Sequence, residues 1–260
     1  MNTLNYITMA QIAFITGASS GIGEACARKF AAGGYTLFLN ARNTAKLHAL
    51  QTELQTTYGS KVILLPFDVR DRQAAETALQ QLPTEYQTID ILVNNAGLAL
   101  GIDKEYEGTE ENYDTMIETN ITALLMMTRL VVPGMVARGK GHIINIGSVA
   151  GDAAYPGGSV YCATKAAVKV LSDGLRMDLV DTPLRVTNVK PGLVETNFSV
   201  TRFAGDKERA DKVYQGIKPL TGEDIAEVVY FAANAPAHVQ IAEVLVLATH
   251  QASGSIVYRR

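Results

Sequence analysis

Tyr161 and Lys165 are the residues whose types and spacing point most directly to chemistry. They lie four positions apart in a stretch with the pattern of a helix, so both side chains would lie on one helix face. A free tyrosine has a pKa of about 10, which is too high for efficient proton transfer near neutral pH. A neighbouring ammonium favours the phenolate and would lower that pKa. The pair could therefore act as an acid and base unit, although the same spacing also arises in helices by chance.

A serine upstream of this pair could donate a hydrogen bond to a substrate oxygen. Ser148 directly follows the apolar run 142–147, at the end of a stretch that we predict to be a buried strand. Ligands of open α/β sheets bind beyond the carboxyl ends of the strands, so the Ser148 hydroxyl would lie at such a site. The alternative is a serine that only caps a turn or a helix.

A glycine-rich turn near the N-terminus is typical of a nucleotide site. Residues 16–23 read TGASSGIG, between a predicted strand and a predicted helix. Glycines let the backbone approach a pyrophosphate closely, and the helix that follows offers free N–H groups and the positive end of its dipole. The spacing differs from the more common G-x-G-x-x-G pattern, and a purely structural turn is the alternative. The position after the first strand favours dinucleotide binding.

The end of the second predicted strand indicates which dinucleotide binds. Sites that prefer NAD usually carry an acidic residue there, which binds the ribose 2′-hydroxyl. Residues 40–43 read Asn-Ala-Arg-Asn, without an acid. Arg42 could pair with the 2′-phosphate of NADP, because a guanidinium matches the geometry of a phosphate. The alternative is a solvated surface arginine, and we predict NADP as the cofactor.

These candidate residues need a fold that brings the ends of several strands together. Short runs rich in Ile, Val and Leu alternate with longer helical stretches, as in a parallel sheet covered on both faces. We therefore predict an α/β protein, a single doubly wound Rossmann-type domain over residues 1–260 with a seven-stranded parallel sheet and helices on both faces. The predicted strands are 12–16, 36–40, 61–67, 89–94, 141–146, 184–190 and 243–247, and the predicted helices are 23–32, 44–57, 72–81, 111–137, 159–180 and 223–233.

One segment, residues 197–218, interrupts this alternation. It follows the sixth predicted strand, is polar and carries charges of both signs. A long insertion at this point often covers a site at the carboxyl ends of the strands, so we predict a substrate lid here. The alternative is a plain surface excursion.

Composition and charge argue against several other classes of protein. The chain is 47% hydrophobic and 19% charged with a net charge of −3, so we expect a soluble protein with no nucleic-acid or membrane partner. Its two cysteines lie far apart in sequence, which favours a reducing compartment over a disulfide framework. No basic residue precedes Arg28, and the apolar run 123–136 is interrupted, so we expect a cytoplasmic protein without a secretory signal or a membrane span. The four histidines lack metal-ligand spacing, and no metal is expected.

Taken together, the motifs resemble those of the short-chain dehydrogenase/reductase family. Each motif is weak alone, but their order and intervals are specific, and the resemblance covers essentially the whole chain. The matching motifs are TGASSGIG at 16–23, Asp68-Val69, Asn94-Asn95-Ala96-Gly97, Asn120, Ser148, Tyr161 with Lys165, and Pro191-Gly192.

The resemblance implies a catalytic set of four residues. Tyr161 would be the general acid and base at the substrate oxygen, and Ser148 would orient and polarise the carbonyl. Lys165 would hold the nicotinamide ribose and lower the pKa of Tyr161, and Asn120 would hold a water molecule that relays protons to Lys165. Family members are usually tetramers or dimers built on the long helices, here 111–137 and 159–180. With Arg42, the expected cofactor contacts are Gly17, Ser19, Ser20, Gly21, Ile22, Gly23, Asp68, Val69, Asn95, Ala96, Gly97, Tyr161, Lys165, Pro191, Gly192, Val194 and Thr196.

The second half of the chain resembles one branch of that family, the NADP-dependent 3-hydroxy acid dehydrogenases that also oxidise serine and allo-threonine. The matching stretches are 157–161, 198–206, 219–227 and 249–253. The resemblance implies hydride transfer between NADP and a small 3-hydroxy or 3-oxo acid, such as serine, allo-threonine or 3-hydroxybutyrate. A broad carbonyl or 3-oxoacyl thioester reductase is the alternative, although residues 240–249 lack the glycines typical of 3-oxoacyl-carrier-protein reductases. A non-catalytic NADP-binding regulator is disfavoured because the catalytic set is complete.

A hydroxy acid substrate carries a carboxylate that needs a cationic partner. Arg202, inside the predicted lid, is our candidate, because an arginine can hold a carboxylate through two hydrogen bonds and so orient the carbinol carbon. The alternative is that Arg202 pairs with Asp206 or Glu208 and stiffens the lid.

Overall fold

A parallel sheet runs through the centre of the molecule. Its strands are β1 (Ile12–Ile15), β2 (Thr36–Asn40), β3 (Val62–Leu65), β4 (Ile91–Asn94), β5 (His142–Ile146), β6 (Arg185–Pro191) and β7 (Glu243–Val246). In this computed structural model, which describes residues 10–260, the strand order is β3-β2-β1-β4-β5-β6-β7 and every neighbouring pair is parallel. The predicted doubly wound α/β fold with seven parallel strands is confirmed.

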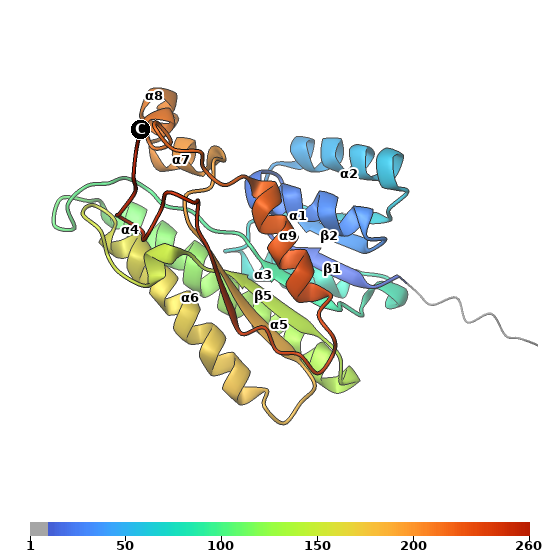
Figure 1. Ribbon diagram of the computed structural model, residues 1–260. Coiled ribbons are helices and arrows are strands. Elements are labelled where there is room, and N and C mark those ends of the chain that lie inside the picture. The colour runs from blue at the N-terminus through green and yellow to red at the C-terminus, as the bar shows by residue number, and fades with distance from the viewer. Residues whose placement is uncertain (1–9) are drawn as a thin grey trace, which may run out of the picture.

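Helices cover both faces of the sheet (Figure 1). The helices that follow the Rossmann-like alternation are α1 (Gly21–Ala32), α2 (Thr44–Tyr58), α3 (Arg72–Gln80), α5 (Ala123–Arg138), α6 (Ser159–Asp178) and α9 (Gly222–Ala233). On one face α1, α2 and α9 enclose a core that includes Phe30 and Leu47. On the other face α3, α5 and α6 enclose a core that includes Met127 and Met135. Burial on both faces explains why the inner strands read as continuous apolar runs.

The predicted helix 111–137 is divided in the structure. It consists of α4 (Glu110–Ile117), a π-helical turn η2 (Glu118–Thr122) and α5. By length and composition alone, the run Glu110–Arg138 could cross a membrane. Its buried side chains instead pack in the core against the sheet, as in the central helix of a globular domain. The π turn interrupts the regular helix at a place where Thr119 and Asn120 are buried, and such turns are frequent at functional sites.

The segment 197–218 contains two short helices that the sequence pattern did not predict. They are α7 (Asn197–Arg202) and α8 (Lys207–Lys212), begun by the side chains of Thr196 and Asp206, which accept hydrogen bonds from backbone N–H groups of the first turn. The C-terminal end of the chain lies beside these helices (Figure 1), and the Arg260 N–H donates to the Gly216 carbonyl. The prediction about a secretory signal rests partly on residues 1–9, which lie outside the described residues.

Candidate active site

One cavity of about 630 Å³ follows the carboxyl ends of the strands. It runs from the glycine-rich turn after β1 to the segment after β6 and the C-terminal tail. Of the residues predicted to bind cofactor or substrate or to act in catalysis, only Gly23 and Asn120 are not part of its lining. The predicted residues that line it are Gly17, Ser19, Ser20, Gly21, Ile22, Arg42, Asp68, Val69, Asn95, Ala96, Gly97, Ser148, Tyr161, Lys165, Pro191, Gly192, Val194, Thr196 and Arg202.

The glycine-rich turn leaves no room for side chains where it passes the cavity. Gly17 has a φ of +66°, and a Cβ there would lie 2.9 Å from the Ala96 Cα. A Cβ on Gly23 would overlap the carbonyl oxygen of Gly17, so Gly23 lies beneath the turn and lets α1 approach it. Ser20, at the start of α1, makes no side-chain cap hydrogen bond, which leaves N–H groups of the first turn available for a pyrophosphate.

The turn after β4 braces the glycine-rich turn. The Thr16 hydroxyl oxygen accepts hydrogen bonds from the N–H groups of Asn95 and Ala96, each over 3.0 Å. The Asn95 side chain donates to the Thr16 carbonyl over 2.8 Å. Both Asn95 and Ala96 also line the cavity, so bracing of the glycine-rich turn and a contact with a ligand are compatible.

The end of the cavity near β2 suits an additional phosphate. The Arg42 side chain is 69% exposed, and its Nη1 lies 3.8 Å from the Asp68 carboxylate. Arg70 holds that carboxylate more closely, at 2.8 Å, and lowers the pKa of Asp68 through this hydrogen bond. Because Asp68 is neutralised mainly by Arg70, the guanidinium of Arg42 remains available to an anion.

Ser148, Tyr161 and Lys165 meet at the centre of the cavity. Ser148 follows β5 and begins the 3-10 turn η3 (Val149–Gly151), where its Oγ accepts from the Ala150 N–H over 3.1 Å. Tyr161 and Lys165 lie in the first turns of α6, and both side chains are buried. The Lys165 Nζ donates to the Ile146 carbonyl over 2.9 Å and lies 5.9 Å from the centre of the Tyr161 ring.

Burial has the largest effect on the pKa values of Tyr161 and Lys165. It raises the pKa of Tyr161, while a hydrogen bond with Ser148 and the charge of Arg202 act in the opposite direction. Burial lowers the pKa of Lys165 to about 8. Burial has the largest effect, so the pKa of Tyr161 is raised, and the effects that lower it come from Ser148 and Arg202 rather than from Lys165 as the sequence predicts. Tyr161 is therefore a neutral phenol near neutral pH and can donate a proton.

Asn120 lies behind the cavity lining, inside the π turn. Its Oδ1 accepts from the Leu98 N–H over 2.9 Å, and its Nδ2 donates to the Leu98 carbonyl and to the Thr164 hydroxyl. A Cβ on Gly97 would lie 3.2 Å from the Asn120 Oδ1 and 3.4 Å from the Lys165 Nζ. Glycine at position 97 therefore lets both the Asn120 amide and the Lys165 ammonium approach the backbone at this point.

Arg202, the last residue of α7, turns toward the reaction centre. It donates to the Gly101 carbonyl over 3.0 Å, to the Tyr155 hydroxyl over 2.9 Å and to the Gly157 carbonyl over 3.4 Å. Its guanidinium carbon lies 6.0 Å from the centre of the Tyr161 ring. All three acceptors are uncharged, so no ion pair within the described part of the chain compensates the charge of this guanidinium at the cavity.

The expected alternative partners of Arg202 are engaged elsewhere. Asp206 accepts a hydrogen bond from the Arg209 N–H at the start of α8. Glu208 pairs with Lys212, one helical turn away. The ion pairs with Asp206 or Glu208 that we considered for Arg202 are thus not formed in this structure.

Several lining residues had no signal in the sequence analysis. Tyr155, Phe198, Gln251, Val257 and Arg259 all line the cavity. Phe198 and Gln251 fall within the matching stretches 198–206 and 249–253, so the resemblance could have identified them. The others reach the cavity through long-range folding, which a local pattern does not report.

The chain belongs to the short chain dehydrogenase family, whose sequence profile matches residues 11–207. It is 45% identical over 247 residues to the NADP-dependent 3-hydroxy acid dehydrogenase of Schizosaccharomyces pombe, covering 95% of each chain. It is 46% identical over 250 residues to the NADP-dependent 3-hydroxy acid dehydrogenase YdfG of Salmonella typhi, covering 96% of this chain and 99% of that one. Among solved structures, the closed form of serine dehydrogenase complexed with NADP+ matches with a TM-score of 0.90 and 45% identity, over 96% of this chain and 100% of that chain. The predicted family and the predicted branch of relatives are both confirmed.

Proposed function

We propose that this chain is an NADP-dependent dehydrogenase that transfers a hydride between the nicotinamide and the carbinol or carbonyl carbon of a small 3-hydroxy or 3-oxo acid. The oxidoreductase class and the use of NADP are confirmed by the family and by the NADP-dependent relatives. The observation that carries the acid substrate is Arg202, a cation whose hydrogen-bond acceptors within residues 10–260 are all uncharged and which lies 6.0 Å from the Tyr161 ring centre.

The residues along the cavity fit NADP from one end to the other. The glycine turn would hold the pyrophosphate at the start of α1, because no side chain separates the backbone from the ligand. Arg42 would bind the 2′-phosphate, and Asp68 and Val69 would flank the adenine. Pro191, together with Gly192, Val194 and Thr196, would border the nicotinamide, which supplies or accepts the hydride when NADP is bound.

Proton transfer would rest on Tyr161. In the direction of reduction, its neutral phenol donates a proton to the substrate carbonyl oxygen as negative charge develops there. Ser148 donates a hydrogen bond to the same oxygen and orients it, since the Ser148 and Tyr161 side chains line the same cavity. Lys165 holds the nicotinamide ribose, and Asn120 holds the water molecule through which the proton of Lys165 is exchanged.

Arg202 would bind the carboxylate of the substrate. Each of its terminal nitrogens carries two N–H groups and uses one of them in the structure. One N–H group therefore remains on each nitrogen and can donate to a carboxylate oxygen. Residues 197–218, which carry Arg202, would act as the lid that closes over the substrate.

The test is a comparison of substrates with the purified enzyme. NADP+ reduction would be measured with serine, allo-threonine, 3-hydroxybutyrate and 3-hydroxypropionate. NADPH oxidation would be measured with a 3-oxoacyl thioester and with a neutral ketone. We expect the highest kcat/KM for one of the small acids. A kcat/KM for the thioester or the ketone above that of every acid would contradict the acid assignment and favour the broad reductase.

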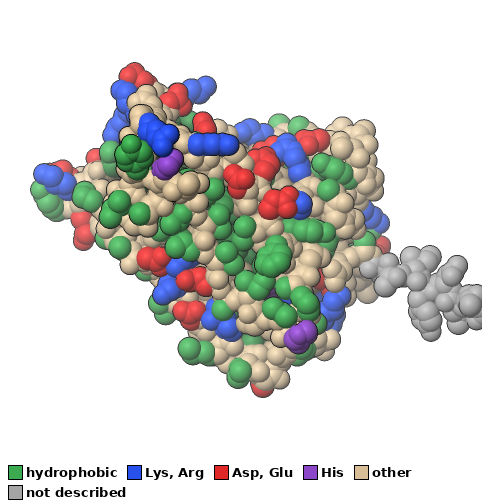
Figure 2. Space-filling view, viewed as in Figure 1, with side chains coloured by type: hydrophobic (Ala, Val, Ile, Leu, Met, Phe, Trp, Pro, Cys, Tyr) green, Lys and Arg blue, Asp and Glu red, His purple; other side chains and the backbone are tan. Residues whose placement is uncertain are grey.

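We further propose that the enzyme is a cytoplasmic homotetramer or homodimer. Large apolar side chains are exposed on the long helices, including Leu125 of α5 and Val170 and Met177 of α6. Hydrophobic side chains also gather over α9 and β7, where Phe231 and Leu245 are exposed (Figure 2). Both cysteines are free thiols, as expected in a reducing compartment. Light scattering after size-exclusion chromatography measures the oligomeric state, and a monomer would contradict this proposal.

A further inference from the structure

A lysine ammonium lies buried beside the reaction centre, between two carboxylates. The side chain of Lys190, in β6, is only 5% exposed. Its Nζ donates to the Asp152 Oδ1 over 2.8 Å and to the Glu243 Oε1 over 2.7 Å. These two carboxylates come from different parts of the fold, because Asp152 directly follows η3 and Glu243 begins β7.

Asp152, one of the two carboxylate partners of Lys190, belongs to the turn that carries Ser148. The Gly151 N–H donates to the Ser148 carbonyl over 3.0 Å, and the Asp152 N–H donates to the Val149 carbonyl over 3.1 Å. A Cβ on Gly151 would lie 2.7 Å from the Lys165 carbonyl oxygen. The turn is thus one hydrogen-bonded unit in direct contact with α6 at Lys165.

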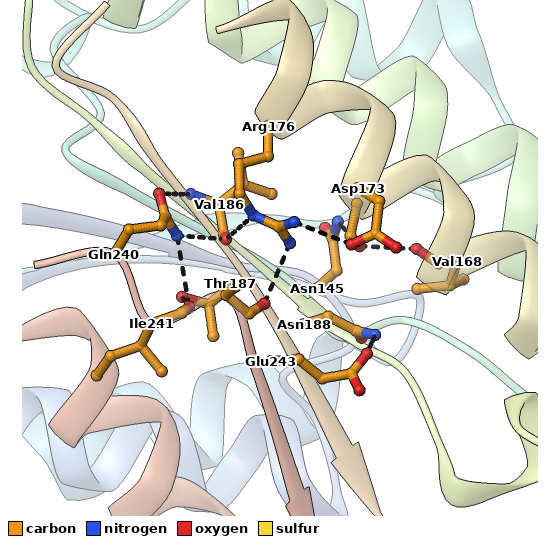
Figure 3. Close-up of polar contacts among 12 residues, drawn as sticks. Asn145, Val168, Asp173, Arg176, Val186, Thr187, Asn188, Gln240, Ile241 and Glu243 are labelled. Atoms are coloured by element: carbon orange, nitrogen blue, oxygen red, sulfur yellow. Dashed lines mark hydrogen bonds and ion pairs between the residues drawn. The ribbon is translucent and has the colours of Figure 1, made fainter. Parts of the chain in front are cut away.

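Glu243, the other partner of Lys190, belongs to the sheet and not to that turn. Glu243 lies opposite Asn188 in the pairing of β6 with β7, and the Asn188 Nδ2 donates to its second carboxylate oxygen over 3.2 Å (Figure 3). The two carboxylates have nearly the same exposure, 36% for Asp152 and 33% for Glu243. Asp152 and Glu243 are therefore two similar partners of one lysine, and only Asp152 belongs to the turn that carries Ser148.

An ion pair with a buried ammonium contributes little net stability at this position. Removing charges from water costs free energy that the attraction between them only partly offsets, so an apolar side chain of similar size often serves stability as well. What the charges do supply is a defined geometry, since each carboxylate must meet the ammonium in one arrangement. The residue after Lys190 is Pro191, whose carbonyl oxygen lies 3.5 Å from the Ser148 Oγ.

We propose that Lys190 is a positioning residue for the reaction. Its ion pair with Asp152 fixes the turn that carries Ser148, so that the Ser148 hydroxyl and the Tyr161 phenol can donate to the same substrate oxygen. This inference rests on the catalytic role of Ser148 in the proposed function. Lys190 itself contacts neither substrate nor cofactor and acts only through the turn.

The experiment compares Asp152→Ala with Glu243→Ala, in the full-length enzyme and in the Ser148→Ala background. Asp152→Ala should lower kcat by about tenfold with the Kd for NADPH unchanged, because a misplacement of about 1 Å can cost up to 10²-fold in rate. Glu243→Ala should change kcat by less than about twofold, since the ion pair with Asp152 remains. In the Ser148→Ala background, Asp152→Ala should have no further effect on kcat, which a merely structural role would not produce.

The outcomes separate this inference from the function on which it rests. If Ser148→Ala leaves kcat unchanged, the catalytic role of Ser148 is wrong. Two outcomes would contradict only the positioning role of Lys190, provided that Ser148→Ala lowers kcat. In one, the effects of Asp152→Ala and Ser148→Ala on kcat are additive. In the other, Asp152→Ala and Glu243→Ala change kcat by the same factor. Lys190→Met should lower kcat by about as much as Asp152→Ala does, whereas Lys190→Arg should keep most of the parental kcat. Asp152→Asn, which keeps the size of the side chain, provides the same readout if Asp152→Ala folds poorly.

Discussion

The Nη1 of Arg202 lies 2.9 Å from the hydroxyl oxygen of Tyr155 and donates a hydrogen bond to it. The guanidinium carbon also lies 5.4 Å from the centre of the Tyr155 ring, so this side chain both packs against the arginine and fixes its direction. The pairing joins α7 to the loop between η3 and α6, and no carboxylate among the residues that the structure describes pairs with Arg202 beside Tyr161.

The first prediction concerns recognition of the substrate carboxylate. Arg202→Leu should lower kcat/KM for 3-hydroxybutyrate or serine by about 10–150-fold, the equivalent of the roughly 1.5–3 kcal/mol of a charge-assisted hydrogen bond. A neutral ketone should be affected far less, because it has no carboxylate to hold. The quantity to measure is the ratio of kcat/KM for the acid to that for the ketone. Lys207→Leu, in α8 but outside the cavity lining, is the control, and an unchanged ratio in Arg202→Leu would remove Arg202 from substrate binding.

A second variant tests how Arg202 is held. Tyr155→Phe keeps the ring and removes the hydroxyl that accepts from Arg202. We expect the same ratio to fall, but by less than in Arg202→Leu, because the charge remains and only its direction is released. When Tyr155→Phe is combined with Arg202→Leu, it should no longer change the ratio of kcat/KM for the acid to that for the ketone. If the two substitutions instead lower this ratio independently, Tyr155 does not act through Arg202.

The third prediction concerns the proton donor. Tyr161→Phe removes only the hydroxyl and should lower kcat by ~10²–10⁴-fold, the usual contribution of a general acid or base. The affinity for NADPH, measured by fluorescence titration, should remain close to that of the parent. A steady-state rate within about threefold of the parent would exclude Tyr161 from proton transfer.

The fourth prediction concerns the choice of cofactor. Arg42→Ala should weaken NADPH by about 10–150-fold and NADH much less, because only NADPH carries the 2′-phosphate. Titration of both cofactors with the same variant measures this difference. Equal losses for the two cofactors would mean that Arg42 does not contact the phosphate.

The fifth prediction follows from His142, which is buried at the start of β5 with its Nε2 2.8 Å from the Thr187 hydroxyl. Burial lowers the pKa of His142 to about 3, whereas the unfolded chain has the ordinary value of about 6.5. Below pH 6.5 the unfolded state binds a proton that the folded state does not. The free energy of unfolding should therefore fall with decreasing pH from about 6.5 toward 3, by at most ~1.4 kcal/mol per pH unit from this group.

The comparison with His142→Gln isolates that contribution from the carboxyl groups. Urea unfolding at pH 7, 6 and 5 should show a steeper loss of stability in the parent than in the variant. Parallel pH dependences of the two proteins would mean that His142 takes up its proton in the folded state as well.

The sequence by itself determined the order and type of the main elements and the relation of Tyr161 to Lys165. Strands that are buried on both faces must be apolar throughout, so their pattern is visible without knowledge of their neighbours. Residues four apart in a helix share a face by the geometry of the helix alone. The glycine turn could be recognised for a similar reason, since the close approach of Gly17 and Gly23 to other backbone requires glycine at those positions.

Only the tertiary structure decided which groups the charged residues meet. Arg202 bonds to Gly101 and Tyr155, and Lys190 to Asp152 and Glu243, across long separations in sequence. The predicted helix 111–137 lies within the continuous helical run Glu110–Arg138, but the π turn inside that run, where the Asn120 side chain bonds to Leu98 and Thr164, was not visible in the sequence. Local patterns record the burial of a residue and the period of its element, whereas the partner of a charge is set by the packing of distant segments.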